Sequence, residues 1–461
     1  MNQPDPRRWR LLGLLAVAQF MLILDVTVVA IALPNIETDL HLQRETLTWV
    51  VSAYTLMFGG LMLLGGRAAD LFGSRRVVLV GLAVFTLASL VTGLANGPEV
   101  LLGGRVAQGI GAAMLSPAAL SVVTKTFDGE ERNKALGIWS AMGGGGSAIG
   151  VLLGGLLTAG PGWQWVFYIN LPIGLVVFVV LFRMLPAGTP GERQGRLDVP
   201  GALLVTAGTG TAIYALINAG DRGWLSVATL GTLAGALVLY GVFAWVQRTV
   251  RSPLMDLRIL ARRSVASGTL MLLIATALMI SMFFLGSFYL QHFKQYGALR
   301  TGLLFLPVAI AAIVGAHLAG QFVGKAGARP IAIAIAGFLL TAIGVAAPAL
   351  WDGAAVVVTG MAVGTIGLGA AFVASSTTTF AQVAHHEAGL ASGILSTFHE
   401  FGASLGVAVV SSVAAASLAG TVTTGFTRGF TFAAVTAAVA AALTLIVVPS
   451  FEPSGETAHV H

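Results

Sequence analysis

The chain has 461 residues, of which 56% are hydrophobic and only 10% are charged. A soluble domain carries about 25% charged residues, so this composition excludes a soluble fold of this size. The absence of cysteine excludes disulfides, thiolate nucleophiles and cysteine metal sites. The formal charge of +6 comes from Lys and Arg residues in short segments between apolar runs, which argues against a nucleic-acid surface.

Apolar runs of about twenty residues follow one another along the chain, and each can cross the ~30 Å hydrocarbon core of a bilayer as a helix. We predict fourteen spans, at residues 11–33, 47–66, 77–95, 100–122, 136–157, 165–185, 199–219, 225–246, 265–291, 300–322, 329–347, 354–378, 388–415 and 429–449. The first run is too long for a signal-peptide core and lacks a small-residue cleavage site, so we expect it to be retained. The predicted fold class is an all-α polytopic membrane protein.

The basic residues between the spans are distributed unevenly. If the N-terminus is cytoplasmic, nineteen Lys and Arg residues lie in inside segments and five lie in outside segments. Cytoplasmic loops of membrane proteins carry such an excess of basic residues. We therefore expect a multi-pass protein of the cell (plasma) membrane with both termini in the cytoplasm.

An internal repeat divides the chain. The segment Gly66–Arg75 after the second span has a weaker echo, Gly320–Arg329, after the tenth, at an offset of 254 residues. Repeats of this kind are typical of secondary transporters, whose substrate site lies near the membrane midplane between the repeats. We predict an N-terminal six-helix bundle at 1–185, a linker with two inserted helices at 186–260, a C-terminal six-helix bundle at 261–450 and a cytoplasmic tail at 451–461.

Three charged residues fall well inside the apolar spans: Asp25, Arg105 and Glu400. A charge at bilayer depth costs at least ~2.5–3.5 kcal/mol on insertion scales, so such residues usually face a cavity and have a function. The two carboxylates are candidates for binding and releasing a proton during transport. The alternative for Asp25 and Arg105 is that they neutralise each other and only hold helices together. His399 beside Glu400 either relays protons or hydrogen-bonds within the fold.

Several short motifs carry a family resemblance. They are Leu24 through Pro34, including Asp25, in the first span; Gly66, Asp70, Gly73 and Arg75 after the second; Arg105, Gln108 and Gly109 in the fourth; Gly150, Gly154 and Gly155 in the fifth; and Trp163 through Gly174 at the sixth. Together they resemble the major facilitator superfamily, and the count of fourteen spans resembles its drug–proton antiporter branch. The resemblance covers nearly the whole chain and implies two six-helix bundles plus two inserted helices.

The resemblance also implies roles for individual residues. Asp25 would couple transport to protons, Arg105 would tune that acid, and the loop and glycine motifs would serve conformational switching. Glu400 falls where some members carry an acidic residue for divalent or bulky cations. The chain departs from the family pattern at four positions, which are Ala30, Leu71, Ser74 and Val151, the last replacing a proline of the antiporter motif.

The expected function is export of lipophilic, cationic drugs or antibiotics in exchange for protons, by alternating access. We expect Asp25 and Glu400 to contact substrate, with cavity aromatics drawn from Tyr54, Phe283, Phe288, Tyr289, Phe398 and Phe401. No cofactor, metal site or enzymatic activity is expected, and we predict a monomer driven by the proton gradient. A proton-coupled importer or single-metabolite transporter of the same fold stays open, as does, more remotely, a non-transporting membrane sensor or enzyme.

Overall fold

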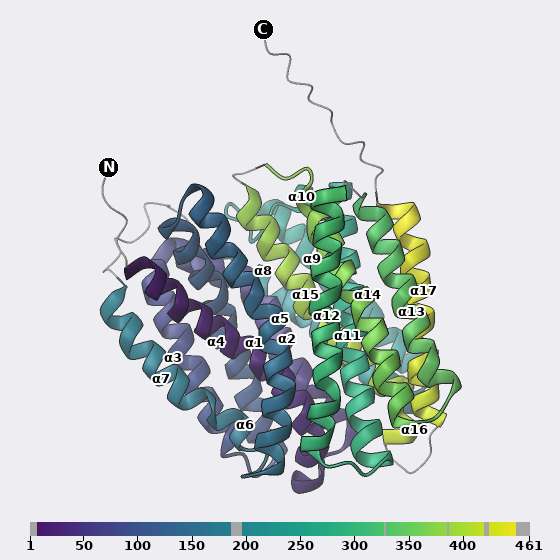
Figure 1. Ribbon diagram of the computed structural model, residues 1–461. Coiled ribbons are helices and arrows are strands. Elements are labelled where there is room, and N and C mark those ends of the chain that lie inside the picture. The colour runs from purple at the N-terminus through teal and green to yellow at the C-terminus, as the bar shows by residue number, and fades with distance from the viewer. Residues whose placement is uncertain (1–6, 186–195, 327–328, 385–386, 419–423, 449–461) are drawn as a thin grey trace.

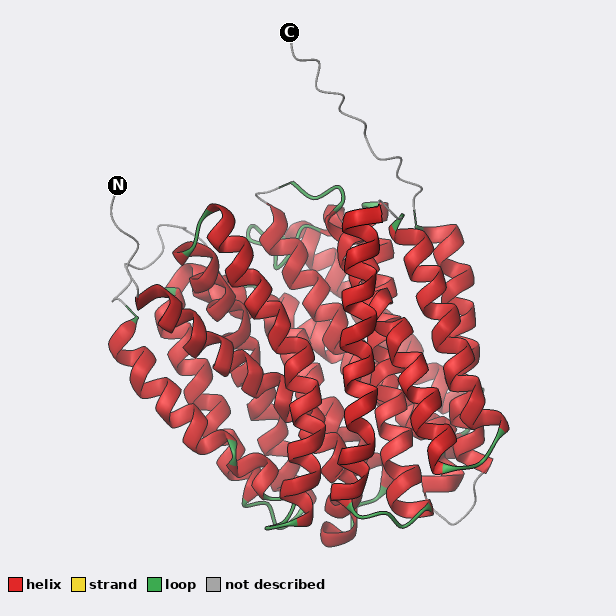
Figure 2. Ribbon diagram, viewed as in Figure 1, coloured by secondary structure: helices red, strands yellow, loops and turns green. Residues whose placement is uncertain are grey.

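The computed structural model describes residues 7–185, 196–326, 329–384, 387–418 and 424–448, and no strand occurs among them (Figure 2). The predicted tail at 451–461 and residues 186–195 of the predicted linker lie outside this description. The elements in chain order are α1 (Arg7–Leu40), α2 (Arg44–Phe72), α3 (Ser74–Gly93), α4 (Pro98–Thr126), α5 (Gly129–Ala159), α6 (Trp165–Tyr168), α7 (Asn170–Met184), α8 (Val199–Arg222), α9 (Val227–Thr249), α10 (Leu257–Ala261), α11 (Arg263–Phe288), the π-helix η1 (Tyr289–Phe293), α12 (Ala298–Ala326), α13 (Pro330–Leu350), α14 (Ala354–Phe380), α15 (Ala388–Val413), α16 (Ala415–Leu418) and α17 (Thr424–Val447).

These helices confirm the prediction of an all-α polytopic membrane fold. Among the described residues, thirteen helical segments are long and apolar enough to cross a membrane. The remaining predicted span, 136–157, lies on α5, a helix of 31 residues that includes the shorter apolar segment Gly145–Ala159. The predicted span 165–185 corresponds to α6 and α7, which together make one segment, Trp165–Met184.

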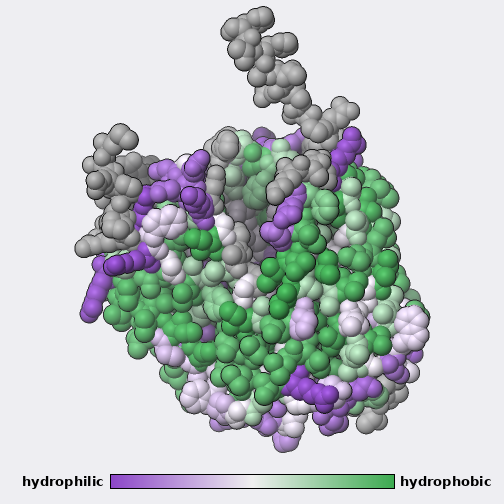
Figure 3. Space-filling view, in the orientation of Figure 1, coloured by the Kyte–Doolittle hydropathy of each residue, from purple (hydrophilic) through white to green (hydrophobic). Residues whose placement is uncertain are grey.

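The helices stand side by side in one bundle (Figure 1). The first turn of α1 and the last turn of α17 lie at the same edge, which we call the proximal edge, and α6 and α16 lie at the opposite, distal edge. Figure 3 shows apolar side chains in a broad band over the visible face, with hydrophilic ones gathered at the two edges. That distribution is expected of a helix bundle whose solvent is the hydrocarbon core of a bilayer.

Two groups of helices meet along two seams. In the first group α1 packs on α5, and α4 packs on α2 and α3; in the second, α14 packs on α11, α12 and α13. The groups contact each other mainly where α2 meets α15 and where α5 meets α12. The inserted helix α8 packs against α9 and also against both α2 and α15, so it lies along one of the two seams. The predicted boundaries at 185, 260 and 450 stay a proposal.

Glycine allows the backbones to approach closely at these seams. A Cβ atom on Gly302 of α12 would lie 2.5 Å from the backbone oxygen of Val151 on α5, and one on Gly155 would lie 2.8 Å from the backbone oxygen of Ala298. In the other seam, a Cβ on Gly59 of α2 would lie 2.7 Å from the Cβ of Glu400. Small residues at helix contacts are the usual means of close packing in membranes.

Candidate functional site

The intramembrane carboxylate of the first helix lies in a fully buried polar cluster. Asp25 Oδ2 accepts a short, charge-assisted hydrogen bond from Arg105 Nη1 of α4. Asp25 Oδ1 accepts from Gln108 Nε2 at 3.0 Å and from Asn170 Nδ2 at 3.2 Å. The carboxylate therefore has three donors, one cationic and two neutral, from two other helices. Such an arrangement holds an ionised carboxylate away from water without leaving either oxygen unpaired.

The guanidinium of Arg105 is also fully engaged. Its Nε donates to the backbone oxygen of Val50 at 2.8 Å, and Nη1 also donates to Gln108 Oε1 at 3.0 Å. Its central carbon lies 4.4 Å from the centre of the Tyr54 ring, whose hydroxyl donates to the backbone oxygen of Leu22. An arginine over an aromatic face gains a cation–π attraction that persists in a dry environment. Arg105 thereby connects α4 to α1 and α2.

Local backbone features bring these side chains together. Arg105 and Gln108 are three residues apart, so they lie on one face of α4. Gly109 follows them, and a Cβ there would lie only 2.6 Å from the backbone oxygen of Tyr54, so the glycine allows α4 to approach α2 this closely. Asn170 begins α7, directly after the break at Ile169, and its amide is thereby directed into the bundle.

Sequence reasoning did not assign two members of this cluster. Asn170 falls within the motif from Trp163 to Gly174 but has no predicted role of its own, and Ser89 of α3 lies in none of the motifs. Ser89 Oγ accepts from Gln108 Nε2 at 2.9 Å and from Asn170 Nδ2 at 3.4 Å, and donates to the backbone oxygen of Phe85. The Oδ1 atom of Asn170 is buried without a hydrogen-bond partner. The available signal was the single amide side chain of the predicted span 165–185 for Asn170, whereas Ser89 is one of three hydroxyl residues in the predicted span 77–95.

The second intramembrane carboxylate is separate from the first. Glu400 on α15 has 9% of its surface exposed and lies in the α2–α15 seam against Gly59. No hydrogen bond or ion pair joins its carboxylate to another described residue, unlike that of Asp25. The neighbouring His399 faces α11 instead, where its Nδ1 lies 2.9 Å from Thr276 Oγ1. The structure thus gives His399 a partner of its own, and proton relay through it stays a prediction.

Hydroxyl groups line the rest of that seam. Thr48 donates to Ser411 at 3.0 Å, and Thr55 pairs with the hydroxyl of Ser404, which also contacts the backbone of Ser52. These contacts run from Glu400 toward the distal edge. They show that α2 and α15 are in direct contact over several turns in this state.

Further contacts join the two groups of helices near the distal edge. Gln291 of η1 donates to the backbone oxygen of Ile31 on α1 at 3.0 Å, and His292 Nε2 lies 3.5 Å from a carboxylate oxygen of Glu37. The close approach of Gly155 and Gly302 lies at the same edge, at the end of α5 and the start of α12. Near the middle of the proximal edge, by contrast, Figure 3 shows a recess. The bundle is therefore packed more tightly at its distal edge.

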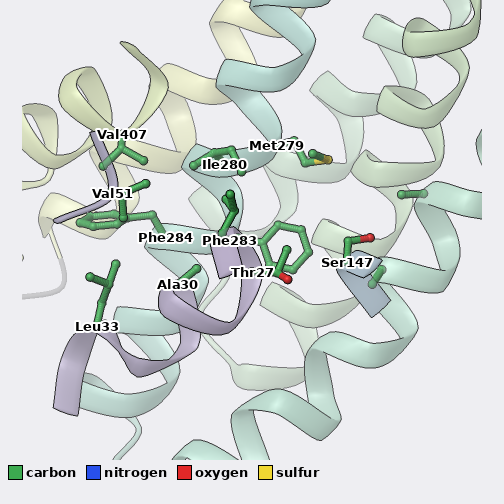
Figure 4. A pocket seen from close by; sticks show the side chains of 13 residues that line it. Thr27, Ala30, Leu33, Val51, Ser147, Met279, Ile280, Phe283, Phe284 and Val407 are labelled. Carbon is green, nitrogen blue, oxygen red and sulfur yellow. The ribbon is translucent and has the colours of Figure 1, made fainter. Parts of the chain in front are cut away.

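A cavity lies between the two groups of helices (Figure 4). It is lined by side chains from α1, α2 and α5 on one side and from α11, α12 and α15 on the other, namely Val26, Thr27, Ala30, Leu33, Val51, Ser147, Met279, Ile280, Phe283, Phe284, Ala309, Ala312 and Val407. Phe283 was among the aromatic residues expected to line a cavity. The cavity lies between the two groups of helices, where secondary transporters place their substrate site, and its lining is mainly apolar.

The other expected cavity residues lie elsewhere in this state. Tyr54 is buried beneath Arg105, and Phe288 is buried with its ring against Phe284. Tyr289 is buried in η1, where its hydroxyl accepts from the backbone of Gly353. Phe398 and Phe401 pack in the cluster around α8 and α15. Their proposed contact with substrate stays a prediction.

The loop motif after α2 has a defined geometry. Gly73 has a φ of 90°, a left-handed conformation that favours glycine and that ends α2 directly before α3. Arg75 donates to the backbone oxygen of Phe182 at 2.8 Å, and its guanidinium lies over the Phe182 ring. Gly66 has only Pro117 near the position of a Cβ, and Asp70 makes an interaction of its own. The role of this motif in conformational switching stays a prediction.

The glycines of α5 serve as close-packing positions. A Cβ on Gly150 would lie 1.8 Å from Thr27 Oγ1, and one on Gly154 would lie 3.0 Å from the backbone oxygen of Val28. Both contacts are with α1, whereas Gly155 faces α12. The family resemblance implies a role in conformational switching for these glycines, and that role stays a prediction; this state shows them in close helix packing.

No group of three or more His, Cys, Asp or Glu side chains able to hold a metal ion occurs in the described part of the chain.

Comparisons with known proteins agree with this architecture. A model of the Major Facilitator Superfamily matches residues 15–407. A bacterial homologue of the human lysosomal transporter Spinster, solved in an inward-facing and occupied conformation, has a TM-score of 0.68 at 17% identity, covering 96% of this chain and 97% of that one. That likeness shows the fold.

Curated relatives are similar over most of their length. The puromycin resistance protein pur8 of Streptomyces alboniger is 37% identical over 424 residues, which cover 90% of this chain and 84% of the relative. The cephamycin export protein CmcT of Amycolatopsis lactamdurans is 37% identical, with 89% and 85% covered, and the multidrug resistance protein Stp of Mycobacterium tuberculosis is 36% identical, with 89% and 77% covered. The chain therefore belongs to the major facilitator superfamily and is a multi-span membrane transporter of small molecules.

Proposed function

We propose that this protein exports lipophilic drugs or antibiotics from the cell, driven by protons that enter through Asp25. The names of its relatives support the direction and the class of cargo, since they are resistance and export proteins for puromycin, cephamycin and multiple drugs. The buried cluster around Asp25 is the single observation that carries the coupling step. The cationic character predicted for the cargo depends on Glu400 and is a separate matter.

The geometry suggests how a proton would act. In this state Asp25 is paired with Arg105 and receives two amide hydrogen bonds, so both of its carboxylate oxygens have partners. Protonation removes the charge that holds Arg105 and turns one carboxylate oxygen into a donor facing two amide N–H groups. Protonation therefore weakens the connection between α1, α4 and α7, and it favours a different arrangement of these helices.

The same residues link the proton site to the cavity. Asp25 lies two residues before Thr27, and Val26, Thr27 and Ala30 line the cavity on the other side of α1. A rotation or shift of α1 that follows protonation changes the cavity wall directly. Cargo binding and proton binding would then favour different positions of α1, although cargo and proton contact different residues. If the predicted orientation holds, the proximal recess opens to the cytoplasm, where an exporter collects its cargo.

Inside-out membrane vesicles test the proposal. With the vesicle lumen acidified, an exporter driven by protons should accumulate a fluorescent lipophilic drug, and collapse of the pH gradient should stop accumulation. Asp25→Asn should reduce the gradient-dependent component at least tenfold while the protein remains in the membrane at the wild-type level. Accumulation only when the gradient is reversed would identify an importer, and accumulation independent of the gradient would refute the coupling scheme.

A further inference from the structure

Among the described residues, the lining of the cavity between the two groups of helices contains no charged side chain. Of its thirteen residues, only Thr27 and Ser147 carry a hydroxyl, and the remaining ones are aliphatic, aromatic or, for Met279, a thioether. Figure 4 shows Thr27 and Ser147 on the side of the cavity built by α1 and α5, with Phe283 and Phe284 contributed by α11. An organic cation placed here would meet no carboxylate.

The nearest acid along α1 is not available to a cation in the cavity. Asp25 is fully buried and absent from the lining, and both of its carboxylate oxygens already accept hydrogen bonds. Its charge is matched by Arg105. Pairing with a cationic cargo would require Arg105 to be displaced, which would leave a buried guanidinium without its counter-charge, and such a group is strongly destabilising.

The second acid is displaced from the cavity along the helices. Glu400 precedes the lining residue Val407 by seven residues on α15, or about 10 Å at 1.5 Å per residue. Its neighbour across the seam, Gly59, follows the lining residue Val51 by eight residues on α2, or about 12 Å. The carboxylate of Glu400 therefore lies about two helical turns from this lining, on the seam and not on the cavity wall.

From these observations we infer that the cavity selects uncharged lipophilic cargo, aromatic or aliphatic, over organic cations of the same shape. The inference rests on the proposed function, because it names the class of cargo for the same transporter. The free-energy cost of burying an unpaired cation is larger than the gain from its attraction to the Phe283 and Phe284 rings. An uncharged molecule gains the apolar contacts without that penalty.

One polar contact is available to such a cargo. The Thr27 hydroxyl donates to the backbone oxygen of Leu24 at 3.1 Å, so its oxygen can still accept a hydrogen bond. Gly150 provides the space in which this hydroxyl lies, since a Cβ there would be 1.8 Å away. An uncharged cargo with a single hydroxyl or amide donor would therefore fit this wall better than a hydrocarbon.

A matched pair of probes tests the inference. Diphenylhexatriene and its trimethylammonium derivative share one aromatic body and differ in charge. Their binding to the full-length protein in lipid nanodiscs, corrected with protein-free discs, is measured without any pH gradient. We expect at least tenfold tighter binding of the uncharged probe. Equal or tighter binding of the cation would overturn the inference.

A carboxylate introduced into the lining provides a gain-of-function arm. Val407→Asp should shift the ratio of the two dissociation constants at least tenfold toward the cation, because it supplies the missing counter-charge. Val407→Asn is the matched control of equal size, and we expect it to weaken the binding of both probes to the same extent. A wild-type preference for the cation that Glu400→Gln abolishes would place Glu400 in the cargo site and reject the inference.

These measurements are independent of proton coupling. Binding is read without a gradient, so it reports on the cavity even if the vesicle experiment shows no proton-driven transport. In that case the proposed coupling fails and the cargo preference stands. The reverse result, coupled transport with tighter binding of the cation, retains the coupling and rejects the preference.

Discussion

Replacement of Arg105 by methionine should strongly destabilise the protein, and a second change at Asp25 should restore much of the loss. In Arg105→Met the fully buried Asp25 carboxylate loses the one cationic partner that it has among the described residues. Breaking a buried pair by removing one partner costs about 3–5 kcal/mol. The hydrogen bonds from Gln108 and Asn170, at 3.0 and 3.2 Å, remain in this variant. We therefore expect the unfolding free energy to fall by about 3 kcal/mol, the lower end of this range.

The double variant Asp25→Asn with Arg105→Met carries no charge at these two positions, so we expect it to recover about 2 kcal/mol of that loss. Unfolding free energies from denaturing-detergent titrations in mixed micelles provide the measurement, with folded protein checked by gel filtration. The single variant Asp25→Asn completes the cycle. Additive effects of the two substitutions would refute the reasoning, because they would show that the two charges do not stabilise each other.

Two further predictions concern the distal edge. Gly302→Leu should force α5 and α12 apart there, since even a Cβ would lie 2.5 Å from the Val151 backbone oxygen. Pulsed electron paramagnetic resonance between labels on the two helix ends should show a longer distance. The control Gly297→Leu should leave this distance unchanged, because no atom lies within 4 Å of a Cβ at that position. Trp163→Phe removes the 2.9 Å hydrogen bond to Asp39 and should lower the unfolding free energy by about 1 kcal/mol, and an unchanged value would show that this contact contributes nothing.

The fold was predictable from the sequence because every span must be an apolar run long enough to cross the hydrocarbon core of the bilayer. A run of about twenty apolar residues is sufficient evidence for a helix. The helix ends were not predictable in the same way. The first span was predicted to end at residue 33, but α1 continues through Pro34 to Leu40. Hydropathy marks where a helix leaves the apolar core, and the backbone hydrogen bonds of α1 continue beyond that point.

The charged members of the candidate site and the motif residue Gln108 were predictable, whereas two other neutral members were not. Asp25 and Arg105 stood out because a charge is rare and costly in a membrane span. Asn170 and Ser89 complete the cluster, but neutral polar residues are common in such helices, and their partners depend on how the helices pack. The cavity lining was least predictable, because single residues from six helices contribute to it.

The most direct test of the central claim measures protons and cargo together. Purified protein is reconstituted into liposomes that contain a pH-sensitive dye. A lipophilic cargo is then added on one side of the membrane, so that a cargo gradient exists without an initial pH difference. If Asp25 couples the two fluxes, downhill movement of cargo should drive protons the opposite way in the wild type, and Asp25→Asn should move cargo without protons. Equal proton movement in both proteins would contradict the account.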